Sequence, residues 1–135
     1  MKKAILLLVF SALLSACGPS LPTGIDLAVK LLNTDAANAK TLKDKAGDSL
    51  LDFRGVVNSK QDLSEYWYVL VNFRDLAQPP RVYTIRVYFK PAENAKIQLL
   101  NIGDKINFKA KISDPAIEGS VNEDYLTFYR AELTK

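Results

Sequence analysis

Few residues of this 135-residue chain can carry out covalent or acid–base chemistry. The chain has no histidine and a single cysteine, Cys17. Without histidine, a Ser-His-Asp or Cys-His catalytic arrangement and a histidine-ligated metal site are excluded. No carboxylate pair stands at a recognisable spacing, although a paired-aspartate hydrolase stays open. The composition therefore favours a non-catalytic protein without cofactor or metal.

Residues 1–16 have the pattern of a secretory signal peptide. Lys2 and Lys3 precede an apolar run, and the small pair Ser15-Ala16 ends the segment. The stretch from residue 4 to residue 16 has 13 residues, fewer than the roughly 20 of a membrane-spanning helix. We therefore expect cleavage before Cys17. Loss of the two lysines turns 18 basic against 15 acidic residues into 16 against 15, so the formal charge falls from +3 to about +1.

The lone cysteine falls directly after this segment, in the sequence Leu14-Ser15-Ala16-Cys17. These four residues resemble the lipobox of bacterial lipoproteins, in which the cysteine is acylated, palmitate being a usual chain, and becomes the mature N-terminus. The resemblance implies a lipid anchor, and an incidental cysteine beside an ordinary cleavage site is the alternative. In Gram-negative lipoproteins an aspartate after the cysteine usually retains the protein at the inner membrane. The residue here is Gly18, which implies the periplasmic face of the outer membrane.

The mature chain is expected to form one domain behind a short tether. Residues 17–22 are rich in Gly, Pro and Ser and predict the lipidated tether, and residues 23–135 form the domain. Thr23 is the predicted N-cap of a helix that runs to about Ala46, and Asn33-Thr34 could split this helix in two. From Ser49 onward the apolar period changes to two, which predicts strands at 50–57, 66–73, 81–89, 105–112 and 125–133.

Three irregular features accompany these strands. Residues 92–100 predict a short helix between the third and fourth strands. Gly55 indicates a bulge or a sharp coil within the first strand. A phase slip in the last strand predicts a bulge near Tyr129-Arg130.

Five strands with a short helix between the third and fourth follow the order of an OB-fold. The expected fold is mainly β: a five-stranded OB-fold-like Greek-key barrel with an N-terminal helix. Three motifs carry a family resemblance: Leu-x-x-Gly-Asp-x-Ile-x-Phe-x-Ala-x-Ile at 100–112, Phe-Arg-Gly-Val-Val at 53–57, and Asn33-x-x-x-Ala37. They resemble the "tRNA_anti-like" group of small bacterial lipoproteins, which implies an OB barrel that binds nucleic acid or oligosaccharide.

OB-folds bind ligands on the exposed face of strands two and three. The predicted strand phases place four residues outward on this face: Tyr66, Tyr68, Arg86 and Tyr88. Aromatic rings beside a guanidinium suit the stacking of a base or a sugar. A plain solvated or helix-covered surface is the alternative, because tyrosine and arginine are common on sheets.

Two charged groups are weaker candidates. Outward-facing lysines of the fourth strand suit an anionic lipid or a phosphate, although a solvated strand face explains them equally well: Lys105, Lys109 and Lys111. The loop before the last strand carries four carboxylates without EF-hand spacing, so no metal site is predicted: Asp114, Glu118, Glu123 and Asp124.

The leading functional hypothesis is a non-catalytic, lipid-anchored module that binds an envelope protein or a glycan. An inhibitor or immunity protein against a periplasmic toxin or wall hydrolase is the second hypothesis. Nucleic-acid binding is a third and is not favoured, because a net charge of about +1 gives little long-range attraction to phosphate.

Overall fold

The computed structural model describes residues 21–118 and 124–134. The predicted signal peptide, Cys17 and most of the tether lie outside these residues. The elements follow in the order α2 (Thr23–Leu32), α3 (Ala36–Ala46), β1 (Leu51–Asp62), β2 (Trp67–Arg74), β3 (Val82–Phe89), a 3-10 turn (Pro91–Glu93), α4 (Asn94–Gln98), β4 (Lys105–Lys111) and β5 (Thr127–Thr134).

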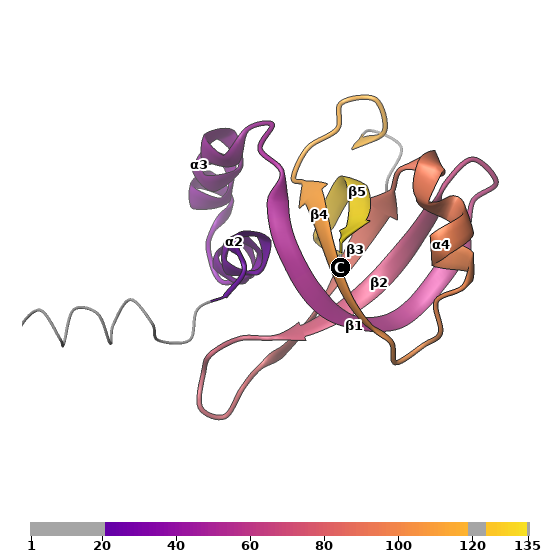
Figure 1. Cartoon of the computed structure of the whole chain (residues 1–135). Coiled ribbons are helices and arrows are strands. Elements are labelled where there is room, and N and C mark those ends of the chain that lie inside the picture. Colours follow the sequence, from indigo (N-terminus) through magenta and orange to yellow (C-terminus); the bar gives the residue numbers. More distant parts are fainter. Residues whose placement is uncertain (1–20, 119–123, 135) are drawn as a thin grey trace, which may run out of the picture.

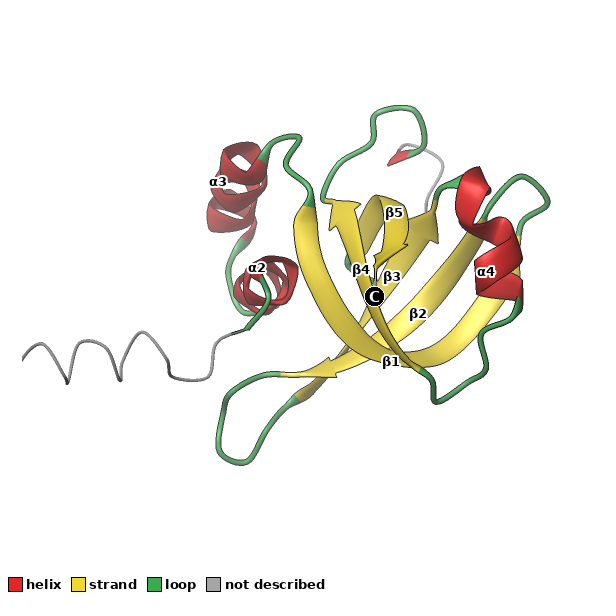
Figure 2. Ribbon diagram, in the orientation of Figure 1, coloured by secondary structure: helices red, strands yellow, loops and turns green. Residues whose placement is uncertain are grey.

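The five strands form a closed barrel in the order β1-β2-β3-β5-β4 (Figure 1). β1 pairs antiparallel with both β2 and β4, whereas β3 and β5 pair in parallel. Three short helices flank the barrel, with α2 and α3 on one side and α4 on the other (Figure 2). The closed, mainly β architecture is compatible with the OB-fold-like barrel expected from the sequence.

The predicted N-terminal helix is two helices, so the split at Asn33-Thr34 is confirmed. The Asn33 side chain donates hydrogen bonds to the carbonyl of Val29 at 2.7 Å and to the Tyr83 hydroxyl at 3.1 Å. Asp35 then caps α3, because its carboxylate accepts a hydrogen bond from the amide of Asn38 at 2.8 Å. The chain thus ends one helix and begins a second within three residues.

The predicted role of Thr23 as an N-cap is wrong. Pro22 occupies that position and Thr23 is already helical. The Thr23 hydroxyl instead accepts a hydrogen bond at 2.9 Å from the amide of Asp52, which joins α2 to the start of β1. One face of α2 packs on the barrel through Ile25, Ala28 and Leu31.

The barrel core follows the predicted alternation in two strands. Val69, Val71 and Phe73 of β2 are buried, as are Ile106, Phe108 and Ala110 of β4. The Phe53 ring stacks on Phe108 with centroids 4.9 Å apart and meets the edge of Phe128 at 4.6 Å. Trp67, at the start of β2 and in phase with these buried residues, is only half-buried because it opposes Asp62 at the last β1–β2 pair.

Gly55 marks a close approach of neighbouring strands. A Cβ atom there would lie 2.5 Å from a methyl group of Val71 and 2.6 Å from the carbonyl oxygen of Asn72. The register shift of β1 against β2 falls slightly later, between Val57 and Ser59. The bulge therefore does not lie at Gly55, where the absence of a side chain instead allows β2 to approach closely.

The predicted bulge in the last strand is confirmed. The register of β5 shifts against both β3 and β4, and Arg130 has a φ of 53°. This extra residue lets Phe128 and Ala131 both face the core.

Gly55→Ala tests the close approach. The new methyl group would displace the backbone of β2, so we expect the free energy of unfolding to fall by about 1–3 kcal/mol. Urea unfolding measures the change. Arg54→Ala, an exposed position of the same strand, is the control and should stay within about 0.5 kcal/mol of the parent. Equal stability of Gly55→Ala and Arg54→Ala would contradict the steric explanation.

Candidate ligand-binding site

The four residues singled out from the sequence lie together on the outer side of the barrel. Tyr68 of β2 opposes Tyr88 of β3, and their ring centroids are 5.6 Å apart. Tyr66, just before β2, meets the Tyr88 ring edge-on at 5.5 Å. The guanidinium carbon of Arg86 lies 5.2 Å from the centre of the Tyr68 ring. The predicted strand phases therefore bring these side chains into contact.

β5 and the residues just before it add two further tyrosines, which were not predicted from the sequence. Tyr129 stacks on Tyr88 with centroids 5.9 Å apart and an interplanar angle of 6°. Tyr125 lies on Arg86, with the guanidinium carbon 5.3 Å from the ring centre. We call the five rings Tyr66, Tyr68, Tyr88, Tyr125 and Tyr129 the tyrosine cluster. Only the pairing of β3 with β5 brings the last two rings to this face.

The expectation that all four predicted residues lie on an open face is wrong. Arg86 is only 6% exposed and Tyr88 only 7%. Tyr129 of β5 covers the Tyr88 ring, and Tyr125, just before β5, covers the Arg86 guanidinium. Tyr66 and Tyr68 are half-buried and stay accessible in part. An incoming ligand therefore meets the border of the tyrosine cluster, not a flat row of rings.

A pocket of about 430 Å³, which we call the tyrosine pocket, opens at this border. Its volume is within the range of small-molecule sites. Its walls come from the Tyr66 and Tyr88 rings, the segment after β3, the β4–β5 loop and β5. The residues that line it include Tyr66, Tyr88, Lys90, Asp114, Ile117 and Arg130. The acidic loop and the bulge in the last strand were visible in the sequence, but nothing there indicated that they meet beside Tyr88.

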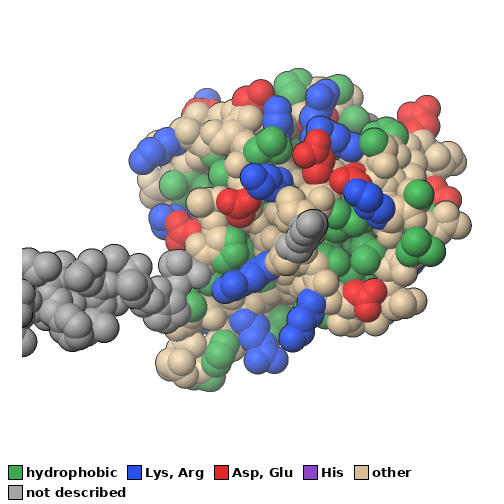
Figure 3. All heavy atoms as spheres, in the orientation of Figure 1, with side chains coloured by type: hydrophobic (Ala, Val, Ile, Leu, Met, Phe, Trp, Pro, Cys, Tyr) green, Lys and Arg blue, Asp and Glu red, His purple; other side chains and the backbone are tan. Residues whose placement is uncertain are grey.

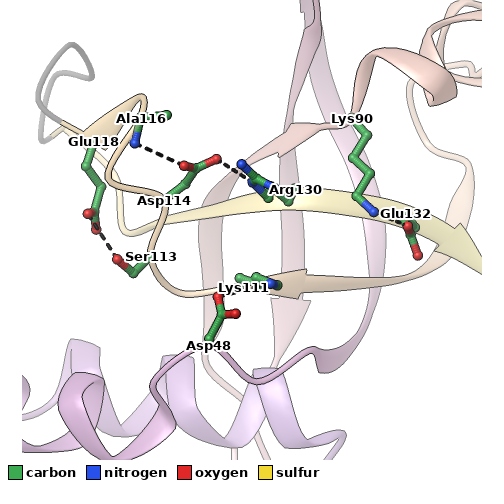
Figure 4. A network of polar contacts seen from close by, with 9 residues as sticks. All are labelled: Asp48, Lys90, Lys111, Ser113, Asp114, Ala116, Glu118, Arg130 and Glu132. Carbon is green, nitrogen blue, oxygen red and sulfur yellow. Dashed lines mark hydrogen bonds and ion pairs between the residues drawn. The ribbon is translucent and has the colours of Figure 1, made fainter.

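An ion pair forms the polar side of this pocket (Figure 4). The Arg130 Nε donates a hydrogen bond to the Asp114 carboxylate at 2.9 Å. The same carboxylate accepts from the amide of Ala116 at 3.1 Å. The hydrogen bond from Arg130 holds the pKa of Asp114 below its usual value, and Asp114 in turn raises the pKa of Arg130. Both groups are therefore charged at neutral pH.

Lys109, Lys111 and Glu118 of the other charged candidates have structural partners, whereas Lys105 has no ion-pair partner among the described residues. Lys109 and Lys111 pair with Asp52 at 3.9 Å and Asp48 at 3.0 Å. Glu118 accepts a hydrogen bond from the Ser113 hydroxyl at 3.0 Å. Within residues 21–118 and 124–134, no three His, Cys, Asp or Glu side chains gather to hold a metal ion. Glu123 lies outside the described residues.

The pocket combines aromatic and charged groups. The half-buried Tyr66 ring offers an apolar wall beside the small accessible part of Tyr88, and the Asp114–Arg130 pair offers a fixed hydrogen-bond acceptor and donor. The pKa of Asp114 is lowered, and the pKa values of Arg130 and Tyr88 are raised, so all three lie further from pH 7 than usual. These three groups therefore keep their protonation state near pH 7.

No protein-family model matches the chain, and no curated protein matches it significantly in sequence. Among the helices of the described residues, none has the length and apolar character to span a membrane.

Alkaline pH tests the burial of the tyrosine cluster. Burial raises the pKa of Tyr129 to about 12, from about 10 in an unfolded chain. Between these values the unfolded chain loses the Tyr129 proton first, so the free energy of unfolding should fall as pH rises from about 10 to about 12. Urea unfolding across this range measures the fall, and Tyr129→Phe should reduce it. An unchanged fall in Tyr129→Phe would show that Tyr129 titrates as in the unfolded chain.

Proposed function

We propose that this protein is a lipid-anchored, non-catalytic binding module on the periplasmic face of the bacterial outer membrane, with an envelope glycan as its ligand. The anchor and the location rest on the signal-like residues 1–16, on Cys17 and on Gly18. The ligand class rests on the pocket beside Tyr66 and Tyr88. An envelope protein that inserts a side chain into the same pocket is the alternative ligand.

We also infer that the barrel is a Greek-key OB-fold. The strand order β1-β2-β3-β5-β4 and the short helix between β3 and β4 support this assignment. OB-folds bind oligonucleotides and oligosaccharides next to strands two and three. The tyrosine cluster and its pocket occupy that part of this barrel.

The observation that carries the ligand class is the pairing of aromatic walls with an ionised rim. A pyranose ring presents a flat face of C–H bonds that packs on an aromatic ring, and its hydroxyls both donate and accept hydrogen bonds. Tyr66 supplies the accessible ring, and Asp114 and Arg130 supply the polar partners. Arg130 pairs with Asp114 and Lys90 pairs with Glu132, so the described lining of the pocket offers no unpaired cation to a phosphate group of a nucleic acid.

Cys17→Ser tests the anchor. Without the thiol the chain cannot be acylated, so the protein should move from the membrane fraction to the soluble fraction and lose incorporated palmitate. Fractionation and metabolic labelling with palmitate measure both changes. Gly18→Asp is the matched variant: it should keep the label and shift the protein from the outer to the inner membrane. Palmitate-free parent protein would overturn the anchor.

Titration with a disaccharide-peptide fragment of peptidoglycan tests the pocket. The parent should bind the fragment saturably, and Tyr66→Ala should weaken binding by about 5- to 150-fold, as expected for the loss of about 1–3 kcal/mol per stacked ring. Calorimetry measures both affinities. Asp114→Asn, which removes the charge that holds Arg130, should also weaken binding.

Tyr125→Ala is the control for this titration. Tyr125 belongs to the tyrosine cluster but is not part of the pocket wall, so its loss should leave the affinity nearly unchanged. Equal losses for Tyr66→Ala and Tyr125→Ala would contradict the pocket assignment. Absence of binding by the parent, together with capture of one envelope protein that Tyr66→Ala fails to retain, would favour the protein ligand.

A further inference from the structure

A second hollow of about 760 Å³ lies on the barrel next to the first described residue, Leu21. We call it the basic groove, because three basic side chains line it: Arg54 of β1, Arg74 of β2 and Lys105, the first residue of β4. The three side chains come from adjacent strands, since β1 pairs with both β2 and β4. Figure 3 shows Lys and Arg side chains gathered on the face next to the start of the described chain.

These three cations carry no structural ion pair. Among the described residues, none of Arg54, Arg74 and Lys105 lies within ion-pair distance of a carboxylate, in contrast to Lys109 and Lys111 of the same β4 strand. The groove is therefore a positively charged surface that faces solvent. Of the lysines of β4, Lys109 and Lys111 form ion pairs, and Lys105 lines the groove.

One carboxylate, Asp75, also lines the groove, but the β2–β3 turn uses it. Its oxygens accept hydrogen bonds from the amides of Ala77 at 3.0 Å and Arg81 at 2.9 Å and from the Tyr83 hydroxyl at 3.2 Å. Three positive side chains thus face one negative side chain whose hydrogen-bonding capacity is largely occupied.

Exposed apolar side chains border the same groove. Leu76 is 54% exposed and Val82 60% exposed, at the two ends of the turn that joins β2 to β3. This turn projects from the barrel below α2 (Figure 1). Large apolar side chains next to unpaired basic ones are typical of surfaces that lie at a membrane interface.

The length of the tether restricts what can face the membrane. Leu21 is four residues after Cys17, so a fully extended chain keeps the two within about 14 Å of each other. A globular domain of about 100 residues is roughly twice as wide as this distance. An acylated Cys17 therefore holds the surface around Leu21, which includes the groove, close to the lipid headgroups.

We propose that the basic groove docks on anionic phospholipid headgroups of the membrane that holds the anchor, with Leu76 and Val82 entering the interface. This inference rests on the proposed acylation of Cys17. Docking would orient the domain, because the basic groove and the tyrosine pocket share no lining residue. In Figure 1 the β4–β5 loop beside the pocket and the β2–β3 turn beside the groove lie at opposite ends of the barrel. The pocket would then face away from the lipid.

Fluorescence of the acylated protein in vesicles tests the docking. Leu76→Cys introduces a thiol for an environment-sensitive fluorophore, because acylation consumes the Cys17 thiol. In vesicles of phosphatidylethanolamine and phosphatidylglycerol, lipids with spin-labelled headgroups should quench this fluorophore severalfold more strongly than one at Leu99→Cys. Leu99 directly follows α4, on the other side of the barrel, and is 80% exposed. Vesicles of phosphatidylcholine should show a much smaller difference.

Charge reversal in the groove supplies the second readout. Arg54→Glu/Arg74→Glu should abolish the quenching at Leu76→Cys, whereas Lys40→Glu/Lys45→Glu on α3 makes the same change in net charge and should preserve it. Circular dichroism checks that each variant folds. Weak quenching at Leu76→Cys, or an equal loss with both charge reversals, would overturn the docking.

A mass measurement on the purified protein separates this failure from failure of the anchor. Acylated protein without quenching would overturn the docking alone. Protein without an acyl chain would overturn the anchor, and the docking inferred from it would fall as well.

Discussion

The parallel pairing of β3 with β5 is the interaction on which both the barrel and the candidate site depend. It closes the strand order β1-β2-β3-β5-β4 into a barrel, so that the described strands leave no open edge. The same pairing lays Tyr125 over Arg86 and Tyr129 over Tyr88. Without β5 in this place, the outer side of β2 and β3 would be the open aromatic face that the strand phases alone suggest.

The bulge at Arg130 connects the core to the pocket. Arg130 has a left-handed backbone conformation, which interrupts the alternation of the strand. Phe128 and Ala131, three residues apart, can therefore both face the core. It also places the Arg130 guanidinium on Asp114 of the β4–β5 loop. A local irregularity of one strand thus positions a loop about 15 residues earlier in the chain and forms the polar side of the pocket.

The two candidate surfaces differ in how their charges are arranged, which suits them to different ligands. In the tyrosine pocket the charges form a pair beside aromatic rings, and a fixed acceptor and donor of this kind select the hydroxyls of a compact ligand. In the basic groove three cations lack carboxylate partners among the described residues and lie beside exposed apolar side chains. Such a surface attracts a layer of anionic headgroups without requiring one exact geometry.

Local patterns in the sequence were sufficient for the features that depend on neighbouring residues. The period-two alternation predicted the buried faces of β2 and β4, Asn33-Thr34 marked the break between helices, and the phase slip near Tyr129 located the bulge. Local patterns gave wrong predictions where a contact with a distant segment decides the position of a side chain. Thr23 bonds to Asp52 instead of capping its own helix, and Arg86 and Tyr88 are covered by β5. Periodicity reports which side of a strand faces the core, whereas the order of strands in the closed barrel decides what covers the other side.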